Sequence, residues 1–388
     1  MSPRRLTIVF SGMIAGDPHQ GGAAWAVLQY ILGLRKLGHH VFFVEPIRPA
    51  SVGPPGASFE ESDNAAYFRR VVGQFGIGPC SAFLLTGSKR TVGLQYDDLR
   101  KIARRADLLL NVSGMLTDGA LIDCIPTRAF IDLDPAFVQL WQSACGIDMH
   151  FDAHTHFVTV GQLVGRAGCN VPTCGRQWVP TFQPVVLELW PAVPASEVTY
   201  DAFTTIGNWR GYGSIEHDGI FYGQKAHSMR QIIDLPTHAS EQFLLAMGIH
   251  AAETNDLAAL STNGWRRIDP RAVAGTPDDY RRFIQSSKAE FGIAKSGYVA
   301  SRCGWFSDRS ACYLASSRPV LAQDTGFTQV LPAGTGLLAF TNRDDACDAI
   351  ESIRRDYPRH CRAARSLAEQ WFDSDRVLGA LLDGLGVT

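Results

Sequence analysis

The residues with the clearest chemical potential begin at Ser307. This serine is a good N-cap for a helix that starts at Asp308, with Arg309 and Ser310 in its first turn. A helix N-terminus presents free backbone N–H groups and the positive end of the helix dipole, and both suit a phosphate. The guanidinium of Arg309 adds a group that pairs with phosphate oxygens. The segment therefore predicts a binding site for a diphosphate.

A second part of this site is expected just beyond the next strand. Residues 319–322 have the apolar pattern of a buried strand, and Asp324, Thr325 and Gly326 follow it. Ligands of open α/β sheets bind outside the carboxyl ends of the strands. We therefore expect these three residues to contact the same ligand; a simple turn is the alternative.

Another cluster with chemical potential consists of Asp152, His154 and His156. Alternate residues share one face if this segment is extended, so the three side chains would converge. Such a cluster suits a catalytic base or a contact to a second substrate, and structural polar packing is the alternative. Two histidines and one aspartate lack the fourth ligand of a structural zinc site, so we predict no metal.

A Gly-rich loop near the N-terminus holds a further histidine, His19. The loop separates a strand predicted over residues 6–10 from a helix predicted to begin near Gly21 and Gly22. Two glycines at a helix start let the backbone approach another molecule closely. The glycine spacing does not fit the G-x-G-x-x-G pattern, which argues against a dinucleotide-dependent oxidoreductase.

The elements that must position these residues form two successive α/β halves. Short buried strands alternate with helices in both halves, which is typical of parallel sheets with crossover helices. A Pro-rich stretch separates the halves, so we predict domains at 1–190 and 200–360 and a C-terminal helical segment at 361–388. Predicted strands include 41–44, 106–112, 127–133, 157–160, 203–206, 265–268 and 291–294, while 243–247 fits a strand or a helix.

Composition argues against several classes of function. The 388 residues carry a formal net charge of −2, so no basic excess favours a nucleic-acid partner. No apolar stretch approaches the roughly 20 residues of a membrane span, and the N-terminal apolar run is too short for a signal peptide. The nine cysteines are scattered and odd in number, as in a reduced protein. We expect a cytoplasmic globular protein.

Residues 286–340 resemble the donor-binding half of GT-B glycosyltransferases. In that group a Gly-containing loop opens a helix, a Pro-Val segment forms the next strand, and a polar Gly-containing turn follows; here these are 304–308, 317–320 and 323–326. The chain is also similar, nearly end to end, to a bacterial group-1-like glycosyltransferase family. That similarity lies in GGAAWAVLQYILGLRKLGH (21–39), IDLDPAFVQLW (131–141), TIGNWRGYG (205–213), EFGIAKSGY (290–298) and GWFSDRSACYLASSRPVLAQDTGF (304–327).

This resemblance implies the GT-B fold: two Rossmann-like doubly wound domains that face each other across a cleft, with C-terminal helices that cross back to the first domain. It implies transfer of a sugar from a nucleotide-diphosphate donor, by preference a UDP- or dTDP-sugar, to an unidentified acceptor hydroxyl. No cofactor and no metal is then expected, because basic side chains and a helix end neutralise the diphosphate.

The resemblance also assigns roles to single residues. The loop after the strand at 203–206 would face the donor, which makes Arg210 and Lys225 candidate phosphate ligands; solvated surface charges are the alternative. His19 would be the general base for an acceptor hydroxyl, with the carboxylate of Asp118 orienting it; an exposed loop histidine is the alternative. The residues themselves, without the resemblance, indicate contacts on the acceptor side from Gly21, Gly22, His154 and His156.

One position departs from the family pattern. Many retaining GT-B enzymes carry two glutamates separated by seven residues, the second of which contacts the nucleotide ribose; counting back from Pro319, that position is Cys312. The stereochemical outcome of transfer therefore stays open. Two alternatives to a transferase are a GT-B sugar-nucleotide epimerase, which needs no acceptor, and a non-catalytic sugar-nucleotide binding protein.

Overall fold

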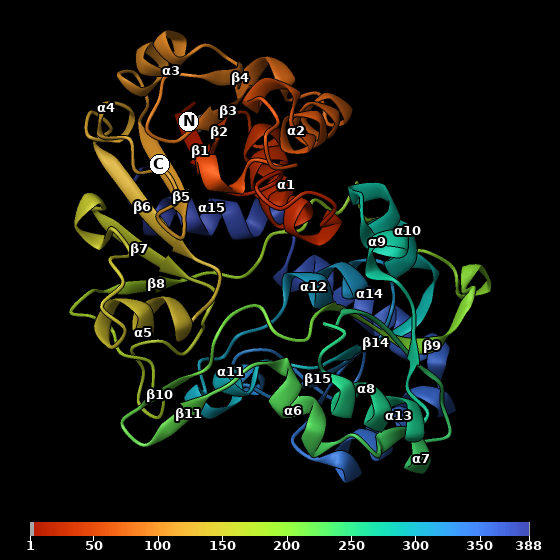
Figure 1. Ribbon diagram of the computed structural model, residues 1–388. Helices are drawn as coiled ribbons and strands as arrows, with labels where there is room; N and C mark the ends of the chain where they lie inside the picture. Colours follow the sequence, from red (N-terminus) through yellow and green to blue (C-terminus); the bar gives the residue numbers. More distant parts are fainter. Residues whose placement is uncertain (1–3, 388) are drawn as a thin grey trace.

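The computed structural model describes residues 4–387, which form two large sheets flanked by helices (Figure 1). The first sheet has eight strands in the order β4-β3-β2-β1-β5-β6-β7-β8, all parallel to their neighbours except β4. Its apolar strands are buried on both faces, as parallel sheets require. The strands are β1 (Thr7–Ser11), β2 (His40–Ile47), β3 (Ser81–Leu85), β4 (Thr91–Gly93), β5 (Leu108–Val112), β6 (Thr127–Asp132), β7 (His156–Thr159) and β8 (Trp178–Pro180).

Successive residues of the first sheet pack into two separate core layers. Phe10 and Phe43 pack on the side of α1 and α2, whereas their neighbours Val9 and Val44 pack on the side of α3 and α4. This alternation is the period of two that a strand imposes on its side chains. The helices are α1 (Gly21–Lys36), α2 (Asp63–Gln74), α3 (Tyr96–Ala103), α4 (Gly119–Ile122) and α5 (Phe137–Ser143).

The second sheet has six parallel strands in the order β13-β12-β9-β14-β15-β16. The ambiguous segment at 243–247 is a strand, β12. The predicted strand at 291–294 begins earlier, because the buried polar residues Ser287 and Glu290 hide its pattern. The strands are β9 (Tyr200–Asn208), β12 (Phe243–Gly248), β13 (Arg266–Arg267), β14 (Ser287–Gly292), β15 (Val320–Gln323) and β16 (Leu337–Phe340).

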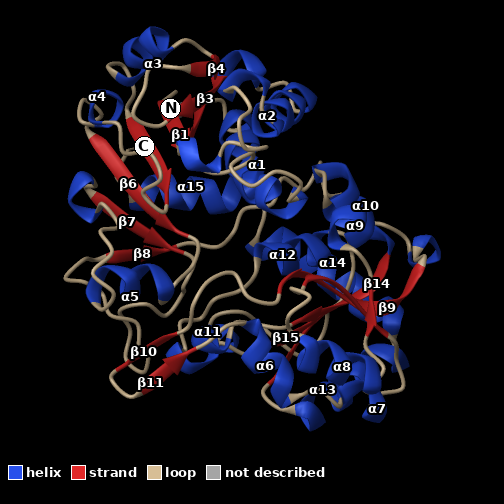
Figure 2. Cartoon of the chain, viewed as in Figure 1, coloured by secondary structure: helices blue, strands red, loops and turns tan. Residues whose placement is uncertain are grey.

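Helices cover this second sheet, and a short hairpin, β10 (Ile215–His217) with β11 (Ile220–Tyr222), extends from it. Figure 2 shows the two sets of strands as separate bodies, with loops and helices between them. The helices are α6 (Lys225–Gln231), α7 (Leu235–His238), α8 (Thr254–Thr262), α9 (Pro270–Ala274), α10 (Pro277–Ser286), α11 (Ser296–Ser301), α12 (Asp308–Ala315) and α13 (Arg343–Arg355).

The chain ends with two helices that belong to different domains. Helix α14 (Tyr357–Trp371) packs against α12 in the second domain, and α15 (Ser374–Gly384) packs against α1 in the first. The chain therefore crosses back near residue 373, rather than at the expected residue 361. Gly33 permits this packing, because a Cβ there would lie 2.5 Å from a methyl of Leu378. Within residues 4–387, no helix is long and apolar enough to cross a membrane.

Candidate active site

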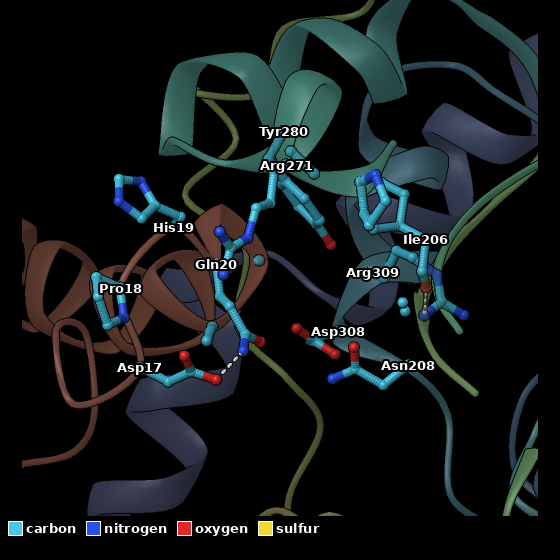
Figure 3. A pocket seen from close by; sticks show the side chains of 16 residues that line it. Asp17, Pro18, His19, Gln20, Ile206, Asn208, Arg271, Tyr280, Asp308 and Arg309 are labelled. Atoms are coloured by element: carbon cyan, nitrogen blue, oxygen red, sulfur yellow. Dashed lines mark hydrogen bonds between the residues drawn. The ribbon is translucent and has the colours of Figure 1, made fainter. Parts of the chain in front are cut away.

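A cavity of about 370 Å³ lies between the two domains. One wall is the loop after β1, with Asp17, His19 and Gln20, and the other is formed by the end of β9 and by helices of the second domain (Figure 3). Both walls follow the carboxyl end of the first strand of a sheet, which is where open α/β folds bind ligands. The second-domain wall includes Ile206, Gly207, Asn208, Gly248, Pro270, Arg271, Ala274, Tyr280, Asp308 and Arg309.

Two cations meet beside Gly207, where β9 ends. A Cβ at this position would lie 2.8 Å from Lys225 Nζ and 3.9 Å from Arg309 Nη1, so glycine leaves room for the lysine. Lys225 is the first residue of α6, and Arg309 lies in the first turn of α12. Gly207 and Arg309 line the cavity, and Lys225 lies directly behind Gly207, outside the lining, so its charge acts on the cavity from the next layer.

The ammonium of Lys225 stands without a counter-ion. Among the residues that the structure describes, it forms neither a hydrogen bond nor an ion pair. Burial, together with the positive charges of Arg309 and Lys295, lowers the pKa of Lys225 to about 7. An anion bound here would restore the charge of the lysine, so the site is suited to a negatively charged ligand.

Arg309 is held by the protein itself. Its Nε donates to Glu290 Oε1 at 2.6 Å, and its Nη1 donates to the carbonyl of Ile206 at 2.8 Å. The Arg309 side chain is 8% exposed and that of Glu290 is fully buried. The residue predicted as the main phosphate ligand therefore has two of its donors occupied, and it acts on the cavity mainly through its charge.

The start of α12 is built as predicted, with one addition. Ser307 Oγ accepts from the backbone N–H of Arg309 at 3.2 Å, which makes it the N-cap. Asp308 lines the cavity (Figure 3), whereas Ser310 is buried and lies outside it. A carboxylate repels phosphate and accepts from hydroxyl groups. This helix start therefore suits the hydroxyls of a ribose or sugar better than a diphosphate.

The turn at Asp324, Thr325 and Gly326 does not line this cavity. Asp324 accepts from the backbone N–H of Gly326 at 2.9 Å, and the Thr325 hydroxyl donates to the carbonyl of Trp305. A Cβ at Gly326 would lie 2.9 Å from Leu163 of the first domain. The turn is therefore held by hydrogen bonds to its own backbone and to Trp305, and it packs between the domains, outside the cavity.

Arg210 also lies away from the cavity. Its Nε donates to Glu253 Oε1, so the guanidinium already has an acidic partner. Of the two cations predicted to follow β9, Lys225 is the one left to receive an anion.

The predicted pair of His19 and Asp118 is not formed. Asp118 caps α4 through the Ala120 N–H at 3.0 Å and accepts from the hydroxyl of Tyr96 at 2.8 Å, in a separate hollow. His19 instead contacts the ring of Tyr67, with 5.4 Å between the ring centroids. The reason is the sheet, because the helices that follow these two loops, α1 and α4, cover opposite faces.

His154 and His156 do not form the predicted cluster either. Residues 151–153 form a 3-10 turn, so the expected alternation is broken before β7. His154 is buried, its Nε2 lies 3.0 Å from Asn111 Nδ2, and burial lowers its pKa to about 4. His156 contacts Thr155, and Asp152 pairs with Arg176. None of the three lines the cavity, so the structural alternative holds for this segment.

Gly21 and Gly22 allow a close approach, but the partner is the second domain of the same chain and not another molecule as predicted. A Cβ at Gly21 would lie 2.2 Å from the carbonyl oxygen of Thr276, and one at Gly22 would lie 2.8 Å from the ring of Tyr280. Gly22 also lines the cavity. The start of α1 is thereby fixed against α10.

A further contact between the domains is an ion pair. Lys295 Nζ donates to both oxygens of Asp134 at 2.9 and 2.8 Å, and the hydroxyls of Tyr212 and Tyr298 also donate to this carboxylate. The side chains of Asp134 and Lys295 are 22% and 16% exposed. Asp134 follows β6 of the first sheet, and its three partners belong to the second domain.

Replacing Asp134 with asparagine is expected to destabilise the protein by roughly 2–4 kcal/mol, because it leaves a largely buried ammonium without its counter-ion. Urea unfolding measures this loss. The control is Asp98→Asn, which removes the exposed pair with Lys101 and should change stability by less than about 0.5 kcal/mol. Equal effects of the two substitutions would contradict a special role for the pair between the domains.

The cavity residues that escaped prediction from the sequence include Gln20, Asn208, Arg271 and Tyr280. Gln20 is next to the predicted His19, and Asn208 lies just after the predicted strand at 203–206. Their positions in the sequence could therefore have indicated them. Arg271 and Tyr280 lie on α9 and α10, and only the packing of α10 against α1 brings them to the cavity. Cys312 lies outside it, where its thiol accepts from Gln29 Nε2 at 3.8 Å.

Within residues 4–387, no group of three His, Cys, Asp or Glu side chains is arranged to hold a metal ion.

No protein-family model and no curated protein sequence matches the chain. Solved structures do match it in fold. HepE from Anabaena, in complex with UDP and glucose, is 11% identical at a TM-score of 0.60, with 99% of this chain and 100% of that chain covered.

Two further structures are similar over nearly their whole length. An α-glucosyltransferase in complex with UDP and a 13-mer DNA is 12% identical at a TM-score of 0.61, with 99% and 100% of the two chains covered. A glycosyltransferase from Rickettsia africae is 12% identical at a TM-score of 0.54, with 99% and 98% covered. The chain therefore has the GT-B fold, with two Rossmann-like domains and a C-terminal helix that returns to the first.

Proposed function

We propose that this chain is a glycosyltransferase that moves a sugar from a nucleotide-diphosphate donor to an acceptor hydroxyl. The observation that carries the proposal is the unpaired ammonium of Lys225, which lies beside two residues that line the cavity between the domains, Gly207 and Arg309. Proteins of the same fold hold UDP or UDP-glucose, which favours a UDP-sugar; dTDP-sugars remain the second choice.

In this proposal the donor diphosphate lies against Lys225, and Asp308 and Asn208 accept from donor hydroxyls. Lys225 stabilises the negative charge that develops on the departing UDP. Closure around the donor excludes water and so limits its hydrolysis. The residues at hand supply this charge without a metal or a further cofactor.

The acceptor side of the proposed site is the loop between β1 and α1. We propose His19 as the base that removes the proton of the acceptor hydroxyl, although its ring lies at the rim and is directed away from Asp308 in Figure 3. Its φ of +68° is uncommon for a residue with a side chain, as at many functional positions. A turn of the loop on acceptor binding would bring the ring inward.

His19→Ala is expected to lower turnover by roughly 10²-fold or more, the usual contribution of a general base. UDP affinity should stay within threefold, because the cation cluster is untouched. The measurement is release of UDP from UDP-glucose, with a panel of hydroxyl acceptors. Asp17→Asn is the matched variant on the same loop, and a normal rate in His19→Ala with a loss in Asp17→Asn would move the base to Asp17.

We also propose a cytoplasmic location. All nine cysteines are free thiols, which a reducing compartment would maintain. The net charge of −2 supports a small-molecule acceptor over a nucleic acid.

A further inference from the structure

The loop that forms the first-domain wall of the cavity has no regular secondary structure. Residues 12–20 connect β1 to α1, and the wall is made by Asp17, His19 and Gln20 at the end of this loop. A loop of this kind has few backbone hydrogen bonds of its own, so other groups must hold its main chain.

Glu45, near the end of β2, supplies one of these groups. Its Oε1 accepts from the backbone N–H of Ala15 at 2.7 Å and from that of Gly16 at 2.6 Å. The side chain is fully buried, and its second oxygen, Oε2, has no hydrogen bond in the described part of the chain. Burying a carboxyl group in this way is costly, so its retention calls for a specific role.

Asn64 on α2 holds the same loop from the other direction. Its Nδ2 donates to the carbonyl of Ala15 at 2.8 Å, and its Oδ1 accepts from the backbone N–H of Gly53 at 2.8 Å. The residue is 2% exposed. Glu45 therefore accepts from the N–H groups of Ala15 and Gly16, and Asn64 donates to the carbonyl of Ala15.

We propose that Glu45 is a positioning residue for the reaction, which fixes the main chain at Ala15 and Gly16 so that Asp17 and His19 form the acceptor wall. This proposal rests on the proposed function for its effect on turnover, but the anchoring of the loop can be measured without it. Glu45 touches neither Lys225 nor the second-domain wall, so it should leave donor binding alone.

Burial raises the pKa of Glu45 to about 8, against the N–H bonds that lower it. Its Oε1 accepts the two backbone N–H groups in either protonation state. Glutamine has the same shape and the same acceptor oxygen without the charge. Leucine has a similar volume and no acceptor. The pair Glu45→Gln and Glu45→Leu thus separates the hydrogen bonds from the filling of space.

The first measurement is hydrogen exchange of the backbone amides of the loop in both variants. Exchange at Ala15 and Gly16 should stay within about threefold of the native protein in Glu45→Gln and become at least tenfold faster in Glu45→Leu. Equal protection in the two variants would overturn the proposal. If Glu45→Leu does not fold, Asn64→Ala replaces it. Faster exchange at Ala15 and Gly16 is then expected, and unchanged exchange would contradict the anchoring of the loop.

The second measurement is turnover against UDP binding. Glu45→Leu should lose at least tenfold in kcat for UDP release from UDP-glucose, with the Kd for UDP within threefold, and Glu45→Gln should restore kcat. A native kcat in Glu45→Leu would remove Glu45 from the reaction. Failure of the native protein to bind UDP would instead count against the proposed function, and the exchange result would still stand or fall independently.

Discussion

Lys225→Met should weaken UDP binding by ten- to a hundredfold, because a hydrogen bond from a charged donor to phosphate contributes about 1.5–3 kcal/mol. Methionine keeps much of the length and apolar volume of the side chain, so the fold should be retained. Calorimetric titration with UDP measures the change. Arg210→Met is the matched control, because Arg210 is paired with Glu253 outside the cavity and should leave the affinity within twofold.

The same substitution has a signature in pH. The free protein holds Lys225 with a pKa of about 7, and bound phosphate raises that pKa, so binding takes up a proton. UDP affinity of the native protein should therefore fall as the pH rises above 7, and this dependence should be largely lost in Lys225→Met. An unchanged affinity, or an equal loss in Arg210→Met, would remove Lys225 from the phosphate site.

The stability of the native protein should rise with pH, whereas its UDP affinity falls. The folded-state pKa of Lys225 lies below the ordinary lysine value of about 10.5, so the unfolded chain binds more protons between pH 7 and 10.5. Native stability gains from this residue as the pH rises through that window, and Lys225→Met loses this gain. Unfolding in urea at pH 7 and pH 9 compares the two proteins; identical pH slopes would contradict the buried, unpaired lysine.

A chain that ends at Phe372 should fail to fold stably. Helix α15 buries Val377, Leu378, Leu381 and Leu382 against the first domain, each 7% exposed or less. Burial of each such side chain contributes roughly 1.5–3 kcal/mol, so the helix as a whole matches the usual stability of a domain, about 5–15 kcal/mol. Soluble yield and thermal melting followed by circular dichroism measure the effect.

The control for this truncation is a chain that ends at Leu385, which keeps α15 and should melt within a few degrees of the native protein. If the chain that ends at Phe372 melted at the native temperature, the return of the C-terminus would not support the first domain. The packing of Leu378 onto Gly33 makes that result unexpected.

The sequence predicted those parts of the molecule that local pattern determines. Apolar runs gave the strands, and the cap at Ser307 was found because an N-cap uses neighbours on the chain. Two glycines indicated the close approach at the start of α1, although the partner proved to be Thr276 and Tyr280 of the same chain.

The parts that failed depend on geometry between distant residues. Asp118 and His19 follow neighbouring strands, but the chain leaves β1 and β5 in opposite directions along the sheet, so right-handed crossovers place α1 and α4 on opposite faces. Arg309 and Arg210 looked free in sequence, yet Glu290 and Glu253 occupy them in the structure. That Lys225 lacks an acidic partner, by contrast, can be known only when the fold gives the position of each described carboxylate.

The most direct test of the account is calorimetric titration of the native protein with UDP, with NAD as the control nucleotide. We predict binding of UDP with uptake of a proton at pH 8 and no binding of NAD. Binding of NAD but not UDP, or of neither, would contradict a nucleotide-sugar site at Lys225.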